Sequence, residues 1–403
     1  MERESTTTQI ALLEALKASL FGKEPVYSED TDWAEVVNEA KVQTVMGVIS
    51  PVVPVTDEIT NIGITNYSML LYEQDKLVRL LDKNGIPFVI LKGFAAAKYY
   101  PKPHLRSMGD IDILVPRDRF DDAVSLLEAN GFEYSHGKGD DGKLGVDSRH
   151  IGYMKDGIEY ELHHHFSSKG FDIDDILEKA IEKREYVTMN GYKVPMLPDI
   201  ENGLVLLGHL NQHLVAGNLG FRQLVDWAVF VNKVLNEQQQ TDRFMALVEK
   251  SGLKKLAANV TFMCTKELGL SDDCGIAQGA DPEVSDILLS MIFESGNFGA
   301  KNGGTPHDNN ELLVSDGMYN IKKNGFFPYF QDMGLKRWSL CSKYKFLRPF
   351  AWIYGIFRAV RLGIISEVKT GSFRKQIHEG SEKYVLYEKL GIEASSTTVK
   401  NDH

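Results

Sequence analysis

Two carboxylates stand two residues apart inside the apolar run Gly109-Asp110-Ile111-Asp112-Ile113-Leu114-Val115. Successive side chains on a strand point to opposite faces, so Asp110 and Asp112 share one face and the isoleucines fill the other. Neighbouring negative charges on a buried strand repel each other and are costly to desolvate. A divalent cation removes that cost, and Mg²⁺ commonly links carboxylates to substrate phosphates. This strand therefore predicts a site for a metal ion and a phosphate.

A later strand offers a third carboxylate. The extended runs 151–155 and 158–166 are split by Asp156-Gly157, which is a strong hairpin signal. One face of the second run carries Glu159, Glu161, His163 and His165. If this strand lies beside the Asp110 strand, Glu161 joins the two aspartates, and three carboxylates can hold two metal ions. We expect Glu159 at the surface and His163 in a supporting role rather than as a metal ligand.

Three basic or small residues are candidates for binding phosphate. Lys92 and Gly93 follow the strand predicted at 86–91, where glycine lets the backbone approach a phosphate and a helix start offers free N–H groups. Lys92 itself contacts phosphate, pairs with the carboxylates or is solvated. Arg106 lies four residues before Asp110 and has two interpretations: it clamps a triphosphate in a bidentate manner, or it offsets the carboxylate charge.

Hydrophobic periodicity supplies the elements that must position these residues. Strands are predicted at 86–91 and 108–115, and helices at 9–50, 67–83, 94–100, 118–129, 200–233, 241–251, 253–268 and 282–293. Asp32 is predicted to be a helix N-cap. The expected fold is α+β, with a small mixed β-sheet between helical segments. We divide the chain into a helical segment (1–84), an α/β core (85–199), a helical domain (200–296), an aromatic and basic helical segment (297–391) that begins with a polar, glycine-rich loop, and a disordered tail (392–403).

Composition limits the possible functions. The 403 residues are enough for two to three domains, and 43% hydrophobic with 25% charged residues is ordinary for a globular protein. A net charge of −11 argues against broad nucleic-acid coating, which needs a basic surface. The three cysteines have neither metal-type spacing nor a disulfide pattern. With no signal-peptide core and no apolar run long enough for a membrane span, we expect a cytoplasmic protein without transmembrane segments.

Several motifs together resemble a known family. A strand, a short glycine-containing turn, a helix, Asp-x-Asp on a second strand and a carboxylate on a later strand resemble the nucleotidyltransferase superfamily that contains DNA polymerase β. The chain is more closely similar to the uncharacterised nucleotidyltransferase family of bacteria and archaea. The motifs that carry this resemblance are Leu91-Lys92-Gly93, Tyr100-Pro101, Arg106, Asp110 to Val115, Glu161-Leu162-His163, His209, His213 and Gly220 to Asp226.

This resemblance implies a reaction and a set of site residues. It implies metal-dependent transfer of a nucleoside monophosphate from a nucleoside triphosphate (NTP) to a hydroxyl or phosphate acceptor, with Mg²⁺ or Mn²⁺ as the cofactor. Asp110, Asp112 and Glu161 would bind the metal, and Glu161 could also take the acceptor's proton. Lys92, Gly93 and Arg106 would hold the triphosphate. The acceptor is expected to be a small molecule, a glycan or a protein rather than a nucleic acid.

The chain departs from the superfamily at two positions. Lys92-Gly93 replaces the usual Gly-Ser or Gly-Gly turn, and Glu161 stands where Asp is usual. These departures keep open an alternative function, a non-catalytic module that binds a nucleotide or a partner on the same fold. Arg222 and Asp226 are spaced as an intrahelical ion pair, which is the default interpretation.

The segment 336–375 contrasts with the acidic chain. It holds ten Lys or Arg residues and one acidic residue, with aromatic residues interleaved. One interpretation is a surface that meets an anionic acceptor, a nucleic acid or a membrane. The interpretation we favour is a helical element that packs its aromatic side chains inward.

Overall fold

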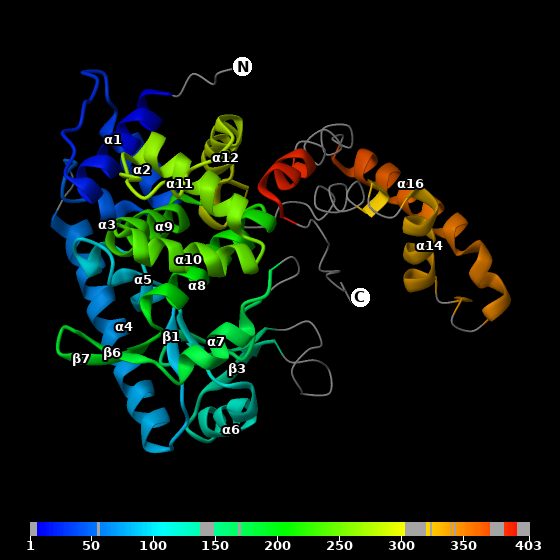
Figure 1. Ribbon diagram of the computed structural model, residues 1–403, viewed down its shortest axis with the longest axis horizontal. Helices are drawn as coiled ribbons and strands as arrows, with labels where there is room; N and C mark the ends of the chain where they lie inside the picture. Colours follow the sequence, from blue (N-terminus) through cyan, green and yellow to red (C-terminus); the bar gives the residue numbers. More distant parts are fainter. Residues whose placement is uncertain are drawn as a thin grey trace. The chain divides into compact units, whose positions relative to one another are not determined.

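The computed structural model describes nearly the whole chain (Figure 1). The described residues are 6–54, 57–137, 149–167, 171–302, 320–322, 325–338, 340–341, 344–370 and 383–392. The predicted tail beyond residue 392 lies outside them. The chain divides into two compact units, Met1–Gly304 and Thr305–His403. The predicted core and the helical domain that follows it both fall in the first unit.

A five-stranded mixed sheet is the centre of the first unit. Its strands have the order β1-β2-β5-β4-β3, and only β2 and β5 run parallel to each other. They are β1 (Val89–Leu91), β2 (Ile111–Leu114), β3 (Glu133–His136), β4 (His150–Lys155) and β5 (Ile158–His163). A separate hairpin consists of β6 (Glu185–Met189) and β7 (Tyr192–Met196). The predicted α+β class with a small mixed sheet is therefore confirmed.

Side-chain alternation gives this sheet two different faces. On one face Ile111, Ile113, Tyr160 and Leu162 are almost fully buried. They share an apolar core with helices α4 (Asp57–Lys83) and α6 (Phe120–Ala129). The intervening residues of β2 and β5 point to the opposite face, so the core fixes which side chains are presented there.

Helices form the remainder of the first unit, and Figure 1 shows α8 to α12 together with α1 to α3 gathered beyond one end of the sheet. They are α1 (Thr7–Phe21), α2 (Trp33–Val42), α3 (Met46–Ile49), α5 (Gly93–Ala97), α7 (Asp174–Ile181), α8 (Asp199–Val215), α9 (Phe221–Val234), α10 (Gln238–Lys250), α11 (Lys254–Leu268) and α12 (Pro282–Ser295). Short 3-10 turns are η1 (Pro103–Leu105), η2 (Arg117–Arg119) and η3 (Asn297–Asn302). Asp32 caps α2 as predicted, accepting hydrogen bonds from two backbone N–H groups.

Local signals accounted for most helix positions but not for every break. The helix predicted over 200–233 is two helices, because the chain turns after Ala216 and Gly217 takes a φ of 71°. Glycine adopts this left-handed conformation without steric cost. Helix α7 and the β6–β7 hairpin lie in a region for which the sequence predicted no elements.

The described residues of the second unit form helical elements, among them α14 (Phe326–Arg337), η4 (Lys345–Phe350) and α16 (Ala351–Thr370). Trp338 and Tyr354 stack with ring centroids 5.3 Å apart. The favoured interpretation of inward packing is wrong for Phe346 and Phe357, whose side chains are 71% and 63% exposed. Among the described residues of the whole chain, no helix is long and apolar enough to cross a membrane.

Candidate active site

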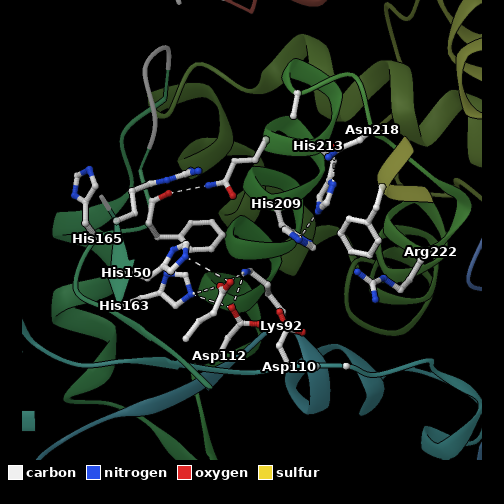
Figure 2. Close-up of a pocket in the computed structure, with 18 of the residues that line it drawn as sticks. Lys92, Asp110, Asp112, His150, His163, His165, His209, His213, Asn218 and Arg222 are labelled. Atoms are coloured by element: carbon white, nitrogen blue, oxygen red, sulfur yellow. Dashed lines mark hydrogen bonds and ion pairs between the residues drawn. The ribbon is translucent and has the colours of Figure 1, made fainter. Parts of the chain in front are cut away.

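A pocket of about 270 Å³ lies on the polar face of the sheet. Its lining residues come from β2, β4 and β5 and the segments next to them, from the turn between β1 and α5, and from α8, α9 and η3. Figure 2 shows His150 and His163 beside Lys92 and Asp112, with His209, His213 and Arg222 on another side of the pocket. All six residues predicted for the site, namely Lys92, Gly93, Arg106, Asp110, Asp112 and Glu161, line this pocket.

The parallel pairing of β2 and β5 brings the carboxylates together. Asp112 is the register partner of Glu161, and Asp110 immediately precedes β2. Asp112 is only 2% exposed. Hydrogen bonds to its side chain, as far as the described residues show, all fall on Oδ1, so Oδ2 remains for another cation.

Lys92 is the cation closest to these carboxylates. Its Nζ lies 2.6 Å from Asp112 Oδ1 and 3.7 Å from Glu161 Oε2. Burial alone would lower the pKa of Lys92, but Asp112, Glu161 and Asp110 outweigh it and raise the pKa. The backbone of Lys92 has φ 45° and ψ −116°, a conformation that strains any residue with a Cβ. The turn between β1 and α5 therefore holds this ammonium group at a cost in backbone energy.

Histidines surround Glu161 on the other side. His163 Nε2 lies 2.9 Å from Asp112 Oδ1 and 3.2 Å from Glu161 Oε2. Burial lowers the pKa of His163, yet these hydrogen bonds outweigh it and raise the pKa. Burial raises the pKa of Glu161, but His163, Lys92 and His150 together lower it well below its usual range. A carboxylate with so low a pKa is a weak base, which suits a cation ligand better than a proton acceptor.

Sequence analysis missed His136 and His150, which approach Glu161 from β3 and β4. His150 Nε2 lies 3.5 Å from Glu161 Oε1 and 3.1 Å from His136 Nε2. Gly152 makes this approach possible, since a Cβ there would lie 2.2 Å from the His136 ring. His136, His150 and Glu161 are close enough to share a metal ion. By contrast, His165 points away from the carboxylates and pairs with Asp174 at the start of α7.

Arg106 lines the pocket, but its guanidinium group forms a bidentate ion pair with Asp226 of α9. Arg106 Nε and Nη2 each donate to Asp226 at 2.8 Å, and Tyr100 Oη donates to the same carboxylate at 2.7 Å. Arg106 and Asp226 are 5% and 2% exposed. The expected intrahelical pair of Arg222 with Asp226 is therefore wrong, because Asp226 points to the buried Arg106.

The helical wall of the pocket carries a chain of neutral histidines. His213 Nδ1 lies 2.9 Å from Asn218 Oδ1, and His213 Nε2 lies 2.9 Å from His209 Nε2. Burial lowers the pKa of His213 to about 4 and that of His209 well below its usual range. With Asn218 Oδ1 as acceptor, His213 carries its proton on Nδ1 and accepts from His209. Both rings are therefore neutral at pH 7.

The region that supplies most of this pocket matches a family model. The model of the uncharacterised nucleotidyltransferase family matches residues 58–269, which is more than half of the chain. The chain belongs to this family. The predicted family is confirmed, and membership makes the protein a transferase of nucleotidyl groups. The matched region contains every predicted site residue and ends with α11.

Several solved structures are similar to part of the chain at low sequence identity. The chain is 11% identical to the antibiotic-resistance factor ANT(2'')-Ia in solution, with a TM-score of 0.34 over 45% of this chain and 92% of that chain. The chain is 12% identical to a crystal structure of ANT(2'')-Ia in complex with adenylyl-2''-tobramycin. The TM-score is 0.31 over 45% of this chain and 98% of that chain. The chain is 16% identical to an antigenic nucleotidyltransferase-like protein from Paracoccidioides brasiliensis. The TM-score is 0.28 over 51% of this chain and 94% of that chain. No curated protein matches the chain.

The donor set of this family member fits a divalent cation. Asp110, Asp112 and Glu161 supply three carboxylates, and Lys92 together with a protonated His163 offsets at most two negative charges. Within the described part of the chain, the Asp110 side chain has no ion-pair partner. Carboxylate oxygens are the ligands that Mg²⁺ and Mn²⁺ prefer. The pocket therefore has both an excess of negative charge and the carboxylate ligands that such a metal requires.

Proposed function

We propose that this protein transfers a nucleoside monophosphate from an NTP to an acceptor, with Asp110, Asp112 and Glu161 holding Mg²⁺ or Mn²⁺. One observation carries the proposal: the parallel register sets Asp112 opposite Glu161 in a pocket that Asp110 also lines. An inactive binding module has no need of three carboxylates gathered at such electrostatic cost.

The reaction balances as a displacement at phosphorus. An acceptor oxygen forms a bond to the α-phosphorus, and the bond from that phosphorus to the bridging oxygen of the β-phosphate breaks. Pyrophosphate leaves with the electron pair, and the proton of an acceptor hydroxyl passes to solvent water. The metal, when bound, supplies charge neutralisation for the phosphates and the leaving group.

The chain's own residues would position the substrate and balance its charge. The turn at Lys92 and Gly93 would lie against the triphosphate. A Cβ on Gly93 would meet only the Asp110 carbonyl oxygen, at 3.9 Å, so the protein leaves open space above this glycine for a phosphate. His163 would keep Asp112 and Glu161 oriented through its two short contacts. Positioning and charge neutralisation supply most of the rate gain in reactions of this type.

The net charge of the chain, rather than the shape of the pocket, limits the range of possible acceptors. A chain with a net charge of −11 repels a polyanion, so the proposed acceptor is a small molecule, a glycan or a protein. A hydroxyl or phosphate of that acceptor would take the nucleotidyl group.

Calorimetric titration of each NTP, with and without Mg²⁺, tests this proposal. The wild type is compared with the Asp110→Asn/Asp112→Asn variant and with Glu161→Gln. Glu159→Gln is a matched control, because Glu159 lies on the same strand but its side chain is 42% exposed and pairs with His136. We expect metal-dependent binding in the wild type and the control, and its loss in the other two variants.

Other outcomes of the titration would reject parts of the proposal. Unchanged metal-dependent binding in Asp110→Asn/Asp112→Asn would place the metal elsewhere. Binding that needs no metal, with no transfer to any acceptor, would support the non-catalytic nucleotide-binding module instead. A folded wild type that binds no NTP would reject both.

A further inference from the structure

Arg222 stands on the helical wall of the pocket (Figure 2). It is the second residue of α9, and its neighbours in the wall are His213, Asn218 and Phe298. The functions described so far assign no role to this wall.

Within the described part of the chain, no carboxylate lies within ion-pair distance of Arg222, and Asp226 and Asp110 act on its charge only from further away. Asp226, one turn further along α9, is engaged by Arg106 and Tyr100. Arg222 Nε is buried and, within the described part of the chain, has no hydrogen-bond acceptor. Burial lowers the pKa of Arg222 despite these distant carboxylates. A buried guanidinium group without a counter-ion in direct contact is costly, which points to an anionic partner that arrives with the ligand.

Phe298 holds the guanidinium group in place. The Arg222 Cζ lies 4.7 Å from the centre of the Phe298 ring, and the same ring contacts His213 at a centroid distance of 5.2 Å. The Phe298 N–H donates to the Asn218 carbonyl oxygen at 3.2 Å, which fixes its backbone at a φ of 55°. Stacking covers one face of a guanidinium and leaves its N–H edge available for an oxyanion.

The two histidines beside Arg222 add no charge to this wall. His209 and His213 are neutral and hydrogen-bonded to each other and to Asn218. An anion bound there would therefore be held by Arg222, with its fork of N–H donors as the specific feature.

We propose that Arg222, stacked on Phe298, forms an oxyanion subsite that binds a phosphate group of a substrate. The inference rests on the proposed function, which brings phosphates into this pocket. The phosphate belongs either to the pyrophosphate part of the NTP or to an anionic acceptor, and the chemistry recognised is the same in both cases.

Calorimetry with pyrophosphate and inorganic phosphate, with and without Mg²⁺, tests the subsite directly. The variants are Arg222→Gln, which removes the charge, and Arg222→Lys, which keeps the charge but loses the fork. Arg79→Gln on α4 is the control, because the Arg79 side chain is 75% exposed and pairs with Asp75. We expect pyrophosphate affinity to fall about 10- to 100-fold in Arg222→Gln, less in Arg222→Lys, and not at all in the control.

Two further titrations identify the source of the phosphate. If it belongs to the nucleotide, Arg222→Gln weakens NTP binding by a similar factor and leaves nucleoside monophosphate binding unchanged. If it belongs to the acceptor, NTP binding is unchanged, and the wild type saturated with a non-hydrolysable NTP analogue still binds inorganic phosphate while Arg222→Gln does not.

The subsite and the proposed function can fail separately. Equal affinity of wild type and Arg222→Gln for pyrophosphate, phosphate and NTP overturns the subsite, as does a folded wild type that binds neither anion. Loss of NTP binding in Asp110→Asn/Asp112→Asn with pyrophosphate binding intact in the absence of metal supports both. If Arg222→Gln does not fold, as judged by circular dichroism, a wild-type affinity in Arg222→Lys overturns the specific role of the fork.

Discussion

Lys92 Nζ lies 2.6 Å from Asp112 Oδ1, so an ammonium group occupies the pocket in which a divalent cation is proposed to bind. One lysine cannot neutralise three carboxylates, and it approaches Asp112 and Glu161 more closely than Asp110. The strained backbone of Lys92 indicates that the position of this charge matters more than the local conformational energy. Lys92 and the metal would then share the neutralisation of one acidic cluster.

Two substitutions of Lys92 separate the effect of its charge on stability from the effect of its strained backbone. Lys92→Ala removes the ammonium group but keeps the strain, and we expect a loss of about 3 kcal/mol in the free energy of unfolding, because the buried Asp112 and the half-buried Glu161 keep only His163 as a partner. Lys92→Gly loses the same charge but relieves the backbone, so it should be more stable than Lys92→Ala by about 1 kcal/mol. Urea denaturation measures both values.

Added Mg²⁺ extends the Lys92 comparison. We expect it to raise the urea midpoint of both variants more than that of the wild type, because the ion replaces the missing charge. A Lys92→Ala variant as stable as Lys92→Gly would contradict the strain, and variants that do not respond to Mg²⁺ would contradict the shared neutralisation.

The pairing of Arg106 with Asp226 makes a different prediction from a role in binding triphosphate. Arg106→Gln leaves a buried Asp226 carboxylate with Tyr100 alone, and we expect it to destabilise the fold by about 3–5 kcal/mol. Arg106→Gln/Asp226→Asn should lose much less than the sum of the two single losses, because neither charge then remains unpaired. Urea denaturation of the four proteins gives this coupling energy.

NTP binding provides the contrasting measurement for Arg106. Folded Arg106→Lys should bind NTP within about threefold of the wild type, since less than 0.7 kcal/mol is then involved. A tenfold loss in Arg106→Lys, without a loss of stability, would instead support a direct contact with the triphosphate.

Local patterns account for what the sequence predicted correctly. Alternation marked the strand with Asp110 and Asp112, and Asp156-Gly157 marked the hairpin that carries Glu161, since both signals lie within a few residues. The register of β5 against β2 is a different kind of information. Asp112 and Glu161 meet through a parallel pairing across a long connection, and no local pattern specifies it. The sequence therefore predicted that Asp112 and Glu161 meet only if their two strands lie side by side.

Long-range partners explain what the sequence could not predict. Spacing assigned Asp226 to Arg222, whereas the fold brings in Arg106 from 120 residues away. Phe298 lay in a stretch interpreted as a polar loop, and its contacts with Arg222 and His213 depend on how η3 packs against α8 and α9. The sequence contains one weak indication of the role of His150. Gly152, two residues later, leaves the space that the His136 ring occupies.

The buried histidines predict how stability depends on pH. The pKa of His213 is about 4 in the folded protein and about 6.5 in the unfolded chain, so the unfolded state binds the extra proton between these values. The contribution of His213 to the free energy of unfolding is therefore fully present above pH 6.5 and is lost as the pH falls towards 4. We expect His213 alone to contribute about 1–2 kcal/mol of this loss between pH 7 and pH 5.

A variant isolates this contribution from the general effect of acid on carboxylates. His213→Gln cannot titrate, so its free energy of unfolding should fall less steeply between pH 7 and pH 5. The polar and charged groups that act on His213 are His209, Asn218, Arg222 and Lys92, and none of them is replaced. Equal slopes for the variant and the wild type in urea denaturation would show that His213 is not buried in its neutral form.

The packing of α8 against α9 should control the helical wall of the pocket, since α8 carries His209 and His213 and α9 carries Arg222. Gly203 of α8 is the contact point, because a Cβ there would lie 2.1 Å from the Phe230 ring of α9. We expect Gly203→Ala to destabilise the protein by about 1–3 kcal/mol through overpacking, and to weaken pyrophosphate binding as the helices separate. Gly63→Ala in α4 is the matched control, since a Cβ there meets nothing within 4 Å, and we expect it to stabilise the protein by about 1 kcal/mol. Thermal unfolding and calorimetry decide the point: pyrophosphate affinity that is unchanged in a destabilised Gly203→Ala would show that the wall keeps its geometry when this contact is strained.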